Sequence, residues 1–353
     1  MIPKLMGAVR LNAPNNLEYC QVPVKEPDEY EVLCKVESVS ICGTDPHIIN
    51  GEYPGFWPKE FPLIPGHEWA GTIVKLGNKA YELGWSVGDR VCGISHKGCG
   101  YCPMCLKGRY NLCLNFGKEE LGHRQYGHIS QGAYAEYMAT SIKSIAKIPD
   151  DMDFNVAACM DPFSIALHVV MRSRIEPGDS VLINGSGAQG LMAILCARSM
   201  GAGTIVVSGS GSRLGAAEKF GAIPIDYHKE DVVARIKEMT HGLGVQRVIE
   251  CSGTEAGIRN SCEVVAKGGC ISIVSLPKSD VQIPIRKIVL DEIDLVGNRA
   301  NPNTITKAIS LAGQYKKELK SMITHEFPLE QYEEALRVFT NREQNSLKVV
   351  MKP

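Results

Sequence analysis

Short runs of alternating apolar and polar residues, broken by glycine and proline, fill the chain up to about residue 155. Residues 30–36 (YEVLCKV) and 70–76 (AGTIVKL) are two examples. Many short strands with such punctuation are typical of a β-rich domain. We therefore expect a barrel-like domain in this part of the chain.

The pattern changes after the turn residues Pro177, Gly178 and Asp179. A helical run, residues 191–200, lies between the first two of four apolar strand candidates, and helical stretches separate the others. These strand candidates are residues 180–184, 204–207, 245–251 and 270–275. Alternation of strands and helices predicts βαβ units and a parallel sheet.

These two patterns divide the chain into two expected domains. A chain of 353 residues is long enough for two, since single domains usually hold about 100–200 residues. Residues 156–297 form the predicted α/β domain. The segment 298–353 is too short for a domain of its own, so we expect it to join residues 1–155.

Composition and charge exclude several classes of protein. A net charge of −1 gives no electrostatic reason to expect nucleic acid or a membrane surface as partner. No apolar run approaches the roughly 20 residues that span a bilayer, and the first residues lack the pattern of a signal peptide. Thirteen cysteines, an odd number spread along the chain, indicate reduced thiols. We therefore expect a cytoplasmic protein.

Four of these thiols lie within fifteen residues: Cys99, Cys102, Cys105 and Cys113. One short loop can wrap four sulfurs tetrahedrally around Zn²⁺, which gives a closed, structural site. A bacterial iron–sulfur run would read C-x2-C-x2-C-x3-C-P, but the last gap here is seven residues and leucine follows Cys113. Disulfides are the other alternative, and the reduced thiols expected elsewhere argue against them.

A glycine-rich loop, Gly185-Ser-Gly-Ala-Gln-Gly190, directly follows one predicted strand and opens a predicted helix. In this context G-x-G-x-x-G indicates a dinucleotide site. Gly185 permits the tight turn, Gly187 lets the backbone approach a pyrophosphate, and Gly190 allows close helix–strand packing. The helix N-terminus favours the anion, so Ala188 and Gln189 join the candidate site. A glycine turn without ligand is the alternative.

The residues after the second strand bear on the choice of cofactor. An NAD site usually has Asp or Glu about 20 residues beyond the glycines, but no carboxylate lies between Gly201 and Arg213. A small polar loop beside an arginine accommodates a 2′-phosphate, so NADP is favoured. Alternatively, Arg213 packs over the adenine and NAD binds without the usual acid. The cofactor-binding candidates here are Ser208, Gly209, Ser210 and Arg213, with Ser252 after the third strand.

Three dispersed segments suggest a second metal site: residues 41–45 (ICGTD), 65–68 (PGHE) and 160–162 (MDP). A catalytic zinc has about three protein ligands and one exchangeable position. Cys42, His67 and one carboxylate would suit it. Each residue also has a plain explanation, as a core thiol, a turn histidine or a helix cap. Spacing alone leaves this question open.

The chain as a whole resembles the zinc-containing medium-chain dehydrogenases, the superfamily of alcohol, polyol and threonine dehydrogenases. The resemblance runs nearly end to end. The matching segments are residues 41–47 (ICGTDPH), 65–77 (PGHEWAGTIVKLG), 87–91 (VGDRV) and 132–137 (GAYAEY), the four-cysteine segment, the Asp161–Pro162 pair and the glycine loop. It implies a GroES-like β-barrel catalytic domain, which includes the C-terminal segment, and a Rossmann cofactor domain.

The resemblance also implies roles for individual residues. Cys42, His67 and Asp161 would ligate a catalytic zinc, with Glu68 as a neighbour that can exchange onto the metal. The metal would act as a Lewis acid on a substrate hydroxyl while hydride passes to the nicotinamide. Thr44 and His47 are the implied proton relay. As alternatives, Thr44 bonds only to backbone and His47 is a surface imidazole.

Substrate recognition is less well specified. Arg299 falls near the point where polyol dehydrogenases carry an arginine followed by tyrosine, but Ala300 occupies the tyrosine position. Arg299 either contacts substrate or is a solvated charge. Trp57, with its neighbour Phe56, either walls an apolar pocket or belongs to the core. His123 and His128 lie in a long polar stretch and are predicted to be surface residues.

Three functional hypotheses follow. We favour a zinc- and NADP-dependent dehydrogenase that interconverts a polyol-like secondary alcohol and its ketone. The second is an amino-alcohol or hydroxy-acid dehydrogenase similar to threonine dehydrogenase. The third, a non-catalytic zinc protein, leaves Cys42, His67 and Asp161 unexplained. The expected partners are a small alcohol or ketone, with one catalytic and one structural zinc per chain, and the resemblance suggests a homodimer or homotetramer.

Overall fold

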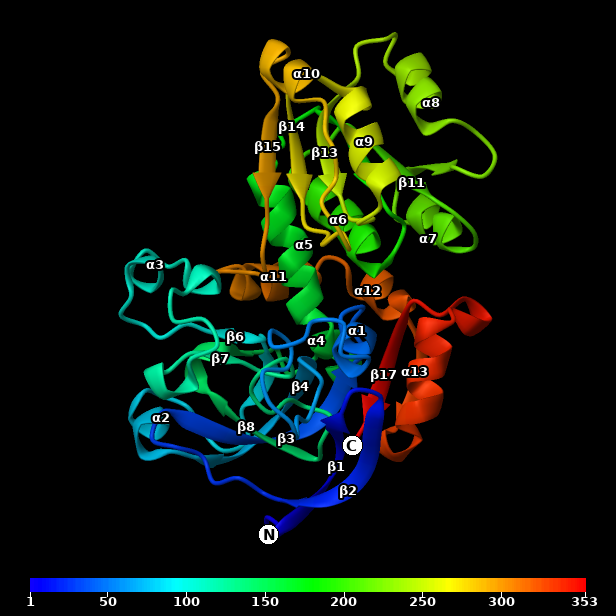
Figure 1. The fold of residues 1–353 in the computed structure, drawn as a ribbon. Helices are drawn as coiled ribbons and strands as arrows, with labels where there is room; N and C mark the ends of the chain where they lie inside the picture. Colours follow the sequence, from blue (N-terminus) through cyan, green and yellow to red (C-terminus); the bar gives the residue numbers. More distant parts are fainter. The chain divides into compact units, whose positions relative to one another are not determined.

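The chain folds into two units, and the second is inserted between the two segments that form the first. In the computed structural model, which describes all 353 residues, the first unit consists of Met1–Asp161 and Asn301–Pro353. The second unit is the intervening segment, Pro162–Ala300 (Figure 1). The boundaries predicted from the sequence, 155/156 and 297/298, lie a few residues earlier.

The first unit is built on a seven-stranded sheet in which β8 branches from β3 and the others follow the order β16-β17-β3-β4-β5-β9. Its strands are β3 (Glu31–Ser40), β4 (Glu68–Leu76), β5 (Arg90–Gly93), β8 (Tyr137–Ser141), β9 (Ile145–Lys147), β16 (Ile323–Pro328) and β17 (Lys348–Lys352). β17 pairs with β3 in antiparallel fashion, Val350 opposite Ser40. The C-terminal segment therefore belongs to the same sheet as the N-terminal strands.

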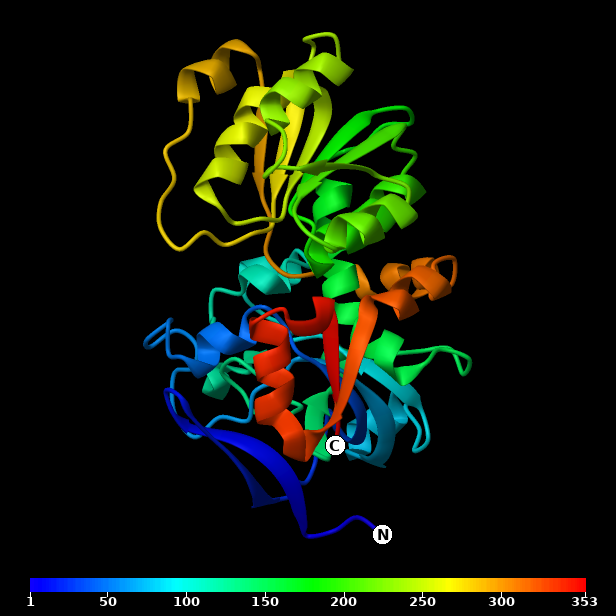
Figure 2. The same cartoon turned by 90° about the vertical axis from the view of Figure 1, so that its right-hand side faces the viewer.

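Smaller elements surround this sheet. Two strand pairs are β1 (Leu5–Ala13) with β2 (Asn16–Pro23), and β6 (His96–Lys97) with β7 (Arg124–Gln125). The helices are α1 (Asp45–Ile49), α2 (Asn78–Glu82), α3 (Pro103–Leu106), α4 (Phe154–Ala158), α11 (Ile305–Ala312), α12 (Lys316–Met322) and α13 (Tyr332–Thr340). Figure 2 shows α13 running beside the C-terminal strands. Helix α5 (Met160–Arg172) begins in this unit and continues into the second.

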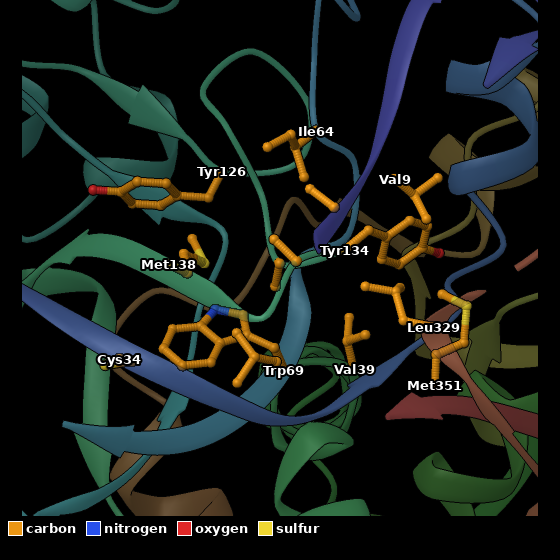
Figure 3. Close-up of a cluster of buried hydrophobic side chains, with 14 of the residues drawn as sticks. Val9, Cys34, Val39, Ile64, Trp69, Tyr126, Tyr134, Met138, Leu329 and Met351 are labelled. Atoms are coloured by element: carbon orange, nitrogen blue, oxygen red, sulfur yellow. The ribbon is translucent and has the colours of Figure 1, made fainter. Parts of the chain in front are cut away.

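One glycine and one core tyrosine of the first unit lie beside the candidate site. Trp69 and Tyr134 are fully buried in this core (Figure 3). Gly66 has a φ of +87°, and a Cβ there would lie 2.2 Å from Cδ1 of Tyr134. Only glycine fits this turn, because a side chain would meet both the strained backbone and the ring. The turn delivers His67 and the first residue of β4, Glu68, beside the tyrosine.

The second unit holds a six-stranded parallel sheet in the order β12-β11-β10-β13-β14-β15. Its strands are β10 (Ser180–Asn184), β11 (Thr204–Gly209), β12 (Ile223–Asp226), β13 (Val245–Glu250), β14 (Val265–Ile273) and β15 (Asp294–Gly297). The connecting helices are α6 (Ala188–Ser199), α7 (Arg213–Lys219), α8 (Val232–Met239), α9 (Glu255–Val264) and α10 (Ile285–Leu290). The strand order reverses between β10 and β13, which is where such sheets bind ligands at their carboxyl ends.

The four strands predicted in this unit are all present, and β10 has the predicted bounds. Val181, Leu182 and Ile183 at its centre are fully buried, as expected for a strand covered by helices on both faces of the sheet. No helix in the structure is both long and apolar enough to span a membrane.

Candidate functional site

The four-cysteine lobe brings its four sulfurs close together. The Sγ atoms of Cys99, Cys102, Cys105 and Cys113 all lie within 4.8 Å of one another. Cys99 and Cys105 are 3.9 Å apart, and Cys102 and Cys113 are 4.0 Å apart. Zinc–sulfur bonds of 2.3 Å give a tetrahedral edge of about 3.8 Å, whereas a disulfide needs about 2.05 Å. The lobe therefore fits a closed zinc site.

Backbone amides support thiolates in this lobe. Cys99 N donates to Cys113 Sγ and Cys102 N to Cys99 Sγ, each at 3.4 Å, and Leu114 N donates to Cys102 Sγ at 3.5 Å. Partial burial opposes ionisation, but the amide donors of Tyr101 and Cys102 outweigh it and lower the pKa of Cys99 to about 6. Such amide donors are typical of the hydrogen bonds that orient metal ligands.

A second donor set forms where the loop after β3 meets the start of β4. One ligand atom each of Cys42, His67 and Glu68 lies within 4.8 Å of the others. His67 and Glu68 are buried, while Cys42 is partly exposed. A thiolate, an imidazole and a carboxylate match the chemistry of a catalytic zinc site. The donor set therefore fits such a metal.

Asp45 forms an ion pair with the imidazole of this set. Its Oδ1 lies 3.4 Å from His67 Nδ1, which leaves Nε2 for a metal. Its Oδ2 accepts hydrogen bonds from Cys42 N and Tyr134 OH, each at 2.8 Å. Burial alone would lower the pKa of His67, but the charges of Cys42 and Asp45 raise it well above its usual value. A carboxylate behind a ligating histidine is a common arrangement in metal sites.

Glu68 has a buried cation as its partner. Lys348 Nζ, on β17, donates to Glu68 Oε2 and also to Ile41 O at 3.0 Å. Both side chains of the ion pair are 3% exposed. Burial alone would lower the pKa of Lys348, but the charge of Glu68 outweighs it and raises that pKa. Glu68 therefore has a fixed position beside Cys42 and His67.

Asp161 lies in the first turn of α5 and is 1% exposed. It is outside the set of ligand atoms within 4.8 Å, although the charges of His67 and Glu68 both act on it. Burial, reinforced by Glu68 and opposed by His67, raises the pKa of Asp161 to about 6. Asn301 Nδ2 donates to its Oδ1 at 2.8 Å. The geometry thus offers two carboxylates, Glu68 in the tight set and Asp161 beside it.

The glycine loop of the second unit has open space where a ligand backbone would approach. A Cβ at Gly190 would lie 1.8 Å from Gly185 O, so Gly190 is required by helix–strand packing. At Gly187, the N-cap of α6, a Cβ would meet only Arg213 Nη1 at 3.8 Å. No side chain caps this helix, so its first amides are free to bind an anion.

Comparison with known proteins decides the family. The alcohol dehydrogenase GroES-like domain matches residues 28–150, and the zinc-binding dehydrogenase family matches residues 188–314. A sorbitol dehydrogenase of Bacillus subtilis (strain 168) is 32% identical, with 100% of this chain and 98% of that protein covered. The chain belongs to the zinc-containing medium-chain dehydrogenases. The predicted GroES-like and Rossmann fold class is thereby confirmed.

Two further relatives of this dehydrogenase show how wide the similarity is. An L-threonine 3-dehydrogenase of Bacillus subtilis (strain 168) is 32% identical over 90% of both chains. A solved structure described as a zinc-binding dehydrogenase from Sinorhizobium meliloti 1021, bound to NADP, superposes with a TM-score of 0.90. It is 31% identical and covers 99% of this chain and 100% of its own.

The two relay candidates of the dehydrogenase lie at opposite ends of one turn. Thr44 Oγ1 donates to Cys42 Sγ at 3.3 Å, so its hydroxyl stands beside the donor set. His47 Nδ1 lies 2.8 Å from Glu52 Oε2, and the side chains of His47 and Glu52 are 35% and 37% exposed. His47 therefore contacts both solvent and a carboxylate. The relay itself stays a prediction.

An aromatic cluster borders the dehydrogenase's donor set. The His128 ring centre is 4.3 Å from that of His67 and 4.8 Å from that of Trp57. Trp57 is buried, and its Nε1 donates to Gln125 Oε1 at 3.0 Å. Phe56 is 39% exposed and stacks on Phe116 at 5.2 Å. This cluster forms a wall beside His67.

The prediction of surface positions for His123 and His128 was wrong. His123 is fully buried and His128 is 4% exposed. His123 Nδ1 accepts from Gly117 N at 3.1 Å, and His128 Nδ1 lies 3.0 Å from Tyr126 O. These local hydrogen bonds make burial of a polar side chain tolerable. A polar sequence pattern could not show them.

The remaining cofactor candidates of the dehydrogenase all follow strands of the second sheet. Ser208 and Gly209 end β11, and Ser210 Oγ lies 3.0 Å from Tyr227 OH. Arg213 opens α7. The side chain of Gln189 contacts a residue of the same unit: its Nε2 donates a hydrogen bond to Pro162 O at 3.4 Å. Ala188, its neighbour, begins α6.

Glu250 shapes the loop that carries Ser252. Ser252 donates to Glu250 Oε1 from both N and Oγ at 2.7 Å, and Gly253 N donates to it at 2.9 Å. Burial raises the pKa of Glu250, although these donors oppose the shift. Arg299, also in this unit, is partly buried, and burial lowers its pKa. The Arg299 guanidinium is therefore not a fully solvated charge.

Sequence reasoning missed the supporting roles of four residues: Asp45, Glu250, Asn301 and Lys348. Asp45 stands in the quoted ICGTD segment, so its closeness to Cys42 was a usable signal. The other three acquire their roles from the contacts described above. No local pattern marks them.

Proposed function

We propose that this dehydrogenase interconverts a polyol-like secondary alcohol and its ketone, with NADP(H) as its preferred cofactor. The observation that carries the proposal is the donor set of Cys42, His67 and Glu68, two of them buried, with the buried Asp161 beside it. Three protein ligands, Cys42, His67 and Asp161, with Glu68 able to exchange onto the metal, would leave the fourth position of a zinc ion for a substrate oxygen. The similarity to a sorbitol dehydrogenase over the whole chain supports the polyol class.

The bound groups and the chain divide the chemistry between them. Zinc, when bound, supplies Lewis acidity at the substrate oxygen, and the nicotinamide accepts or returns hydride. Asp45 holds the His67 imidazole in place. Thr44, beside Cys42, is placed to accept a proton from a substrate hydroxyl while releasing its own. His47 with Glu52, at the partly exposed end of the same turn, is placed to exchange a proton with solvent. The aromatic wall of Trp57 and its neighbours limits water on one side of the site.

The preference for NADP rests on the loop after β11. The end of β11, this loop and the start of α7 supply Ser208, Ser210 and Arg213 rather than a carboxylate, and Tyr227 OH lies 3.0 Å from Ser210 Oγ. Such groups accept a 2′-phosphate that an acid would repel. The NADP bound to the similar Sinorhizobium meliloti protein supports this choice. Initial rates with NADPH and NADH test it, and a clear preference for NADH refutes it.

We propose two zinc ions per chain, one in each donor set. Cys42→Ser should remove one zinc and abolish turnover while the protein stays folded and binds cofactor. Cys102→Ser should remove the other and lower the melting temperature, because a closed zinc site contributes to folding. Zinc content by mass spectrometry, together with activity, distinguishes the sites. Full activity of Cys42→Ser would overturn the mechanism.

A threonine-dehydrogenase-like activity is the second candidate. Arg299 could bind a substrate carboxylate, and Ala300 lacks the aromatic side chain that polyol dehydrogenases carry there. The 32% identity to an L-threonine 3-dehydrogenase supports this alternative. A panel of polyols, amino alcohols, hydroxy acids and ketones, assayed with both cofactors, separates the two. A higher kcat/KM for L-threonine than for sorbitol would favour the second candidate.

Association of the chain with itself is also proposed. Strand β15 lies at the end of the second sheet, and exposed apolar side chains stand on it and on the adjacent α10: Leu295 is 41%, Val289 68% and Leu290 69% exposed. An exposed apolar edge strand is a template for pairing. Sedimentation of the wild type and of Val289→Lys tests this, with a monomeric wild type refuting it. The cytoplasmic location stays a prediction from the cysteines.

A further inference from the structure

Asn301 is a fully buried side chain that fixes one oxygen of Asp161. Its Nδ2 donates to Asp161 Oδ1 at 2.8 Å and lies 3.4 Å from Asp161 O. Asn301 and Asp161 are 0% and 1% exposed. In such a dry environment a hydrogen bond to a carboxylate constrains its orientation strongly. The rotation of the Asp161 carboxylate is thus set by a residue that follows it by 140 positions.

The backbone of Asn301 is tied in turn to the four-cysteine lobe. Tyr110 OH donates to Asn301 O at 3.4 Å and accepts from Asn303 N at 3.2 Å. Asn303 Nδ2 donates to Gly108 O at 2.9 Å. Gly108 and Tyr110 lie in the segment between Cys105 and Cys113. The turn 301–303 therefore spans the distance between the lobe and Asp161.

Ordering of the lobe can affect the turn 301–303 through these hydrogen bonds. Gly108 N donates to Cys105 O at 2.9 Å, so a single hydrogen bond joins Gly108 to the backbone of a lobe cysteine. Burial and the nearby charge of Asp161 raise the pKa of Tyr110, although the Asn303 amide opposes the shift. A closed zinc site orders the loop that holds it. Disorder in that loop would release Tyr110, Gly108 and then the turn.

We propose that Asn301 is a positioning residue for Asp161, and that the turn 301–303 couples the four-cysteine lobe to the catalytic donor set. This inference rests on the proposed function, in which Asp161 serves the catalytic zinc. Hydrogen bonds behind metal ligands typically govern 10- to 100-fold in metal affinity or activity. The lobe then has a second role besides stabilising its own loop.

The first test replaces the amide of Asn301 with an apolar group of similar size. Asn301→Leu should weaken zinc retention at the catalytic site by about 10- to 100-fold in a chelator competition. The Cys42→Ser protein is the reference, because only the lobe zinc remains in it. Circular dichroism and lobe zinc content establish that Asn301→Leu is folded. A folded Asn301→Leu that retains both zinc ions as the wild type does would overturn the proposal.

The second test removes one hydroxyl from the lobe side and does not depend on Asn301→Leu folding. Tyr110→Phe removes both hydrogen bonds of this hydroxyl and should lower kcat and catalytic-zinc retention at least about two- to tenfold, the usual effect of losing even one of them. Tyr101→Phe is the matched control, since its hydroxyl bonds only to Leu121 O at 3.1 Å, at the exposed surface of the same lobe. Equal behaviour of the two variants would refute the coupling.

Failure of this inference can be told from failure of the proposed function. If the wild type oxidises none of the alcohols but Asn301→Leu still loses catalytic-site zinc, the function is wrong and the positioning role stands. If the wild type is an active dehydrogenase and the Asn301 and Tyr110 variants keep its zinc and kcat, the function stands and the coupling is wrong.

Discussion

Removal of the buried Lys348 ammonium is the most informative single perturbation of the first unit. In Lys348→Met the Glu68 carboxylate, 3% exposed, loses its counter-charge, and Ile41 O loses a donor. Removing one partner of a buried ion pair costs about 3–5 kcal/mol, because the other charge stays buried without compensation. For a unit of about 200 residues this corresponds to a fall in Tm of roughly 6–20 °C.

The assay is thermal unfolding of the wild type and variants, with zinc content measured in every sample. Zinc must be measured because a metal ion bound beside Cys42 and His67 would itself neutralise the unpaired charge of Glu68 and hide the loss of Lys348. Lys316→Met is the control: its partner is Asp151, the two side chains are 55% and 67% exposed, and such surface pairs are worth about 0–1 kcal/mol.

A double variant gives the reasoning its sharpest test. Adding Glu68→Gln to Lys348→Met removes the stranded charge, so the double variant should be more stable than Lys348→Met alone. A purely steric effect of the methionine would instead leave the second substitution neutral or harmful. The reasoning is refuted if Lys348→Met costs no more than Lys316→Met, or if Glu68→Gln fails to recover stability.

Three further predictions concern single positions. Gly190→Ala should weaken NADPH binding at least tenfold by fluorescence titration, because its Cβ would lie 1.8 Å from Gly185 O and displace the loop; unchanged affinity would contradict this. Gly66→Ala should cost about 2 kcal/mol or more in thermal unfolding, since it combines a positive φ with a clash against Tyr134; a cost below 0.5 kcal/mol, on the order of a surface substitution, would contradict it. Burial raises the pKa of Asp161 to about 6, so the folded zinc-free protein binds this proton more tightly than the unfolded chain does. Its stability should therefore fall as pH rises through 4–6, relative to Asp161→Asn, and parallel pH curves would count against it.

Strands with continuous buried apolar residues could be predicted from the sequence, and exposed edge strands could not. β10 is bounded by turn residues and buried throughout its centre, so its period and ends are both visible in the sequence. β12 and β15 are four residues long and were not predicted. Ile223 and Leu295 in them are 42% and 41% exposed. Short edge strands depend on pairing with a neighbour, which local pattern does not reveal.

The candidate site divides in the same way. The four cysteines and the glycine loop are local in sequence, so spacing alone indicated their chemistry. Cys42 and His67 were joint candidates from their residue types, but only the resemblance assigned them as ligands of one metal, because two loops far apart in the sequence bring them together. Lys348 and Asn301 could not be predicted at all. Each is a polar residue whose burial is tolerable only because its partner, 280 and 140 positions away respectively, is also buried.

The order of the strands along the chain has a consequence for the order in which the two donor sets form during synthesis. The four lobe cysteines emerge from the ribosome within fifteen residues of one another and can bind zinc at once. The strand that carries Lys348 emerges only after the whole of Pro162–Ala300. Until then Glu68 lacks its cation and Asp161 lacks Asn301. We therefore expect the lobe to load zinc co-translationally and the catalytic donor set to mature last.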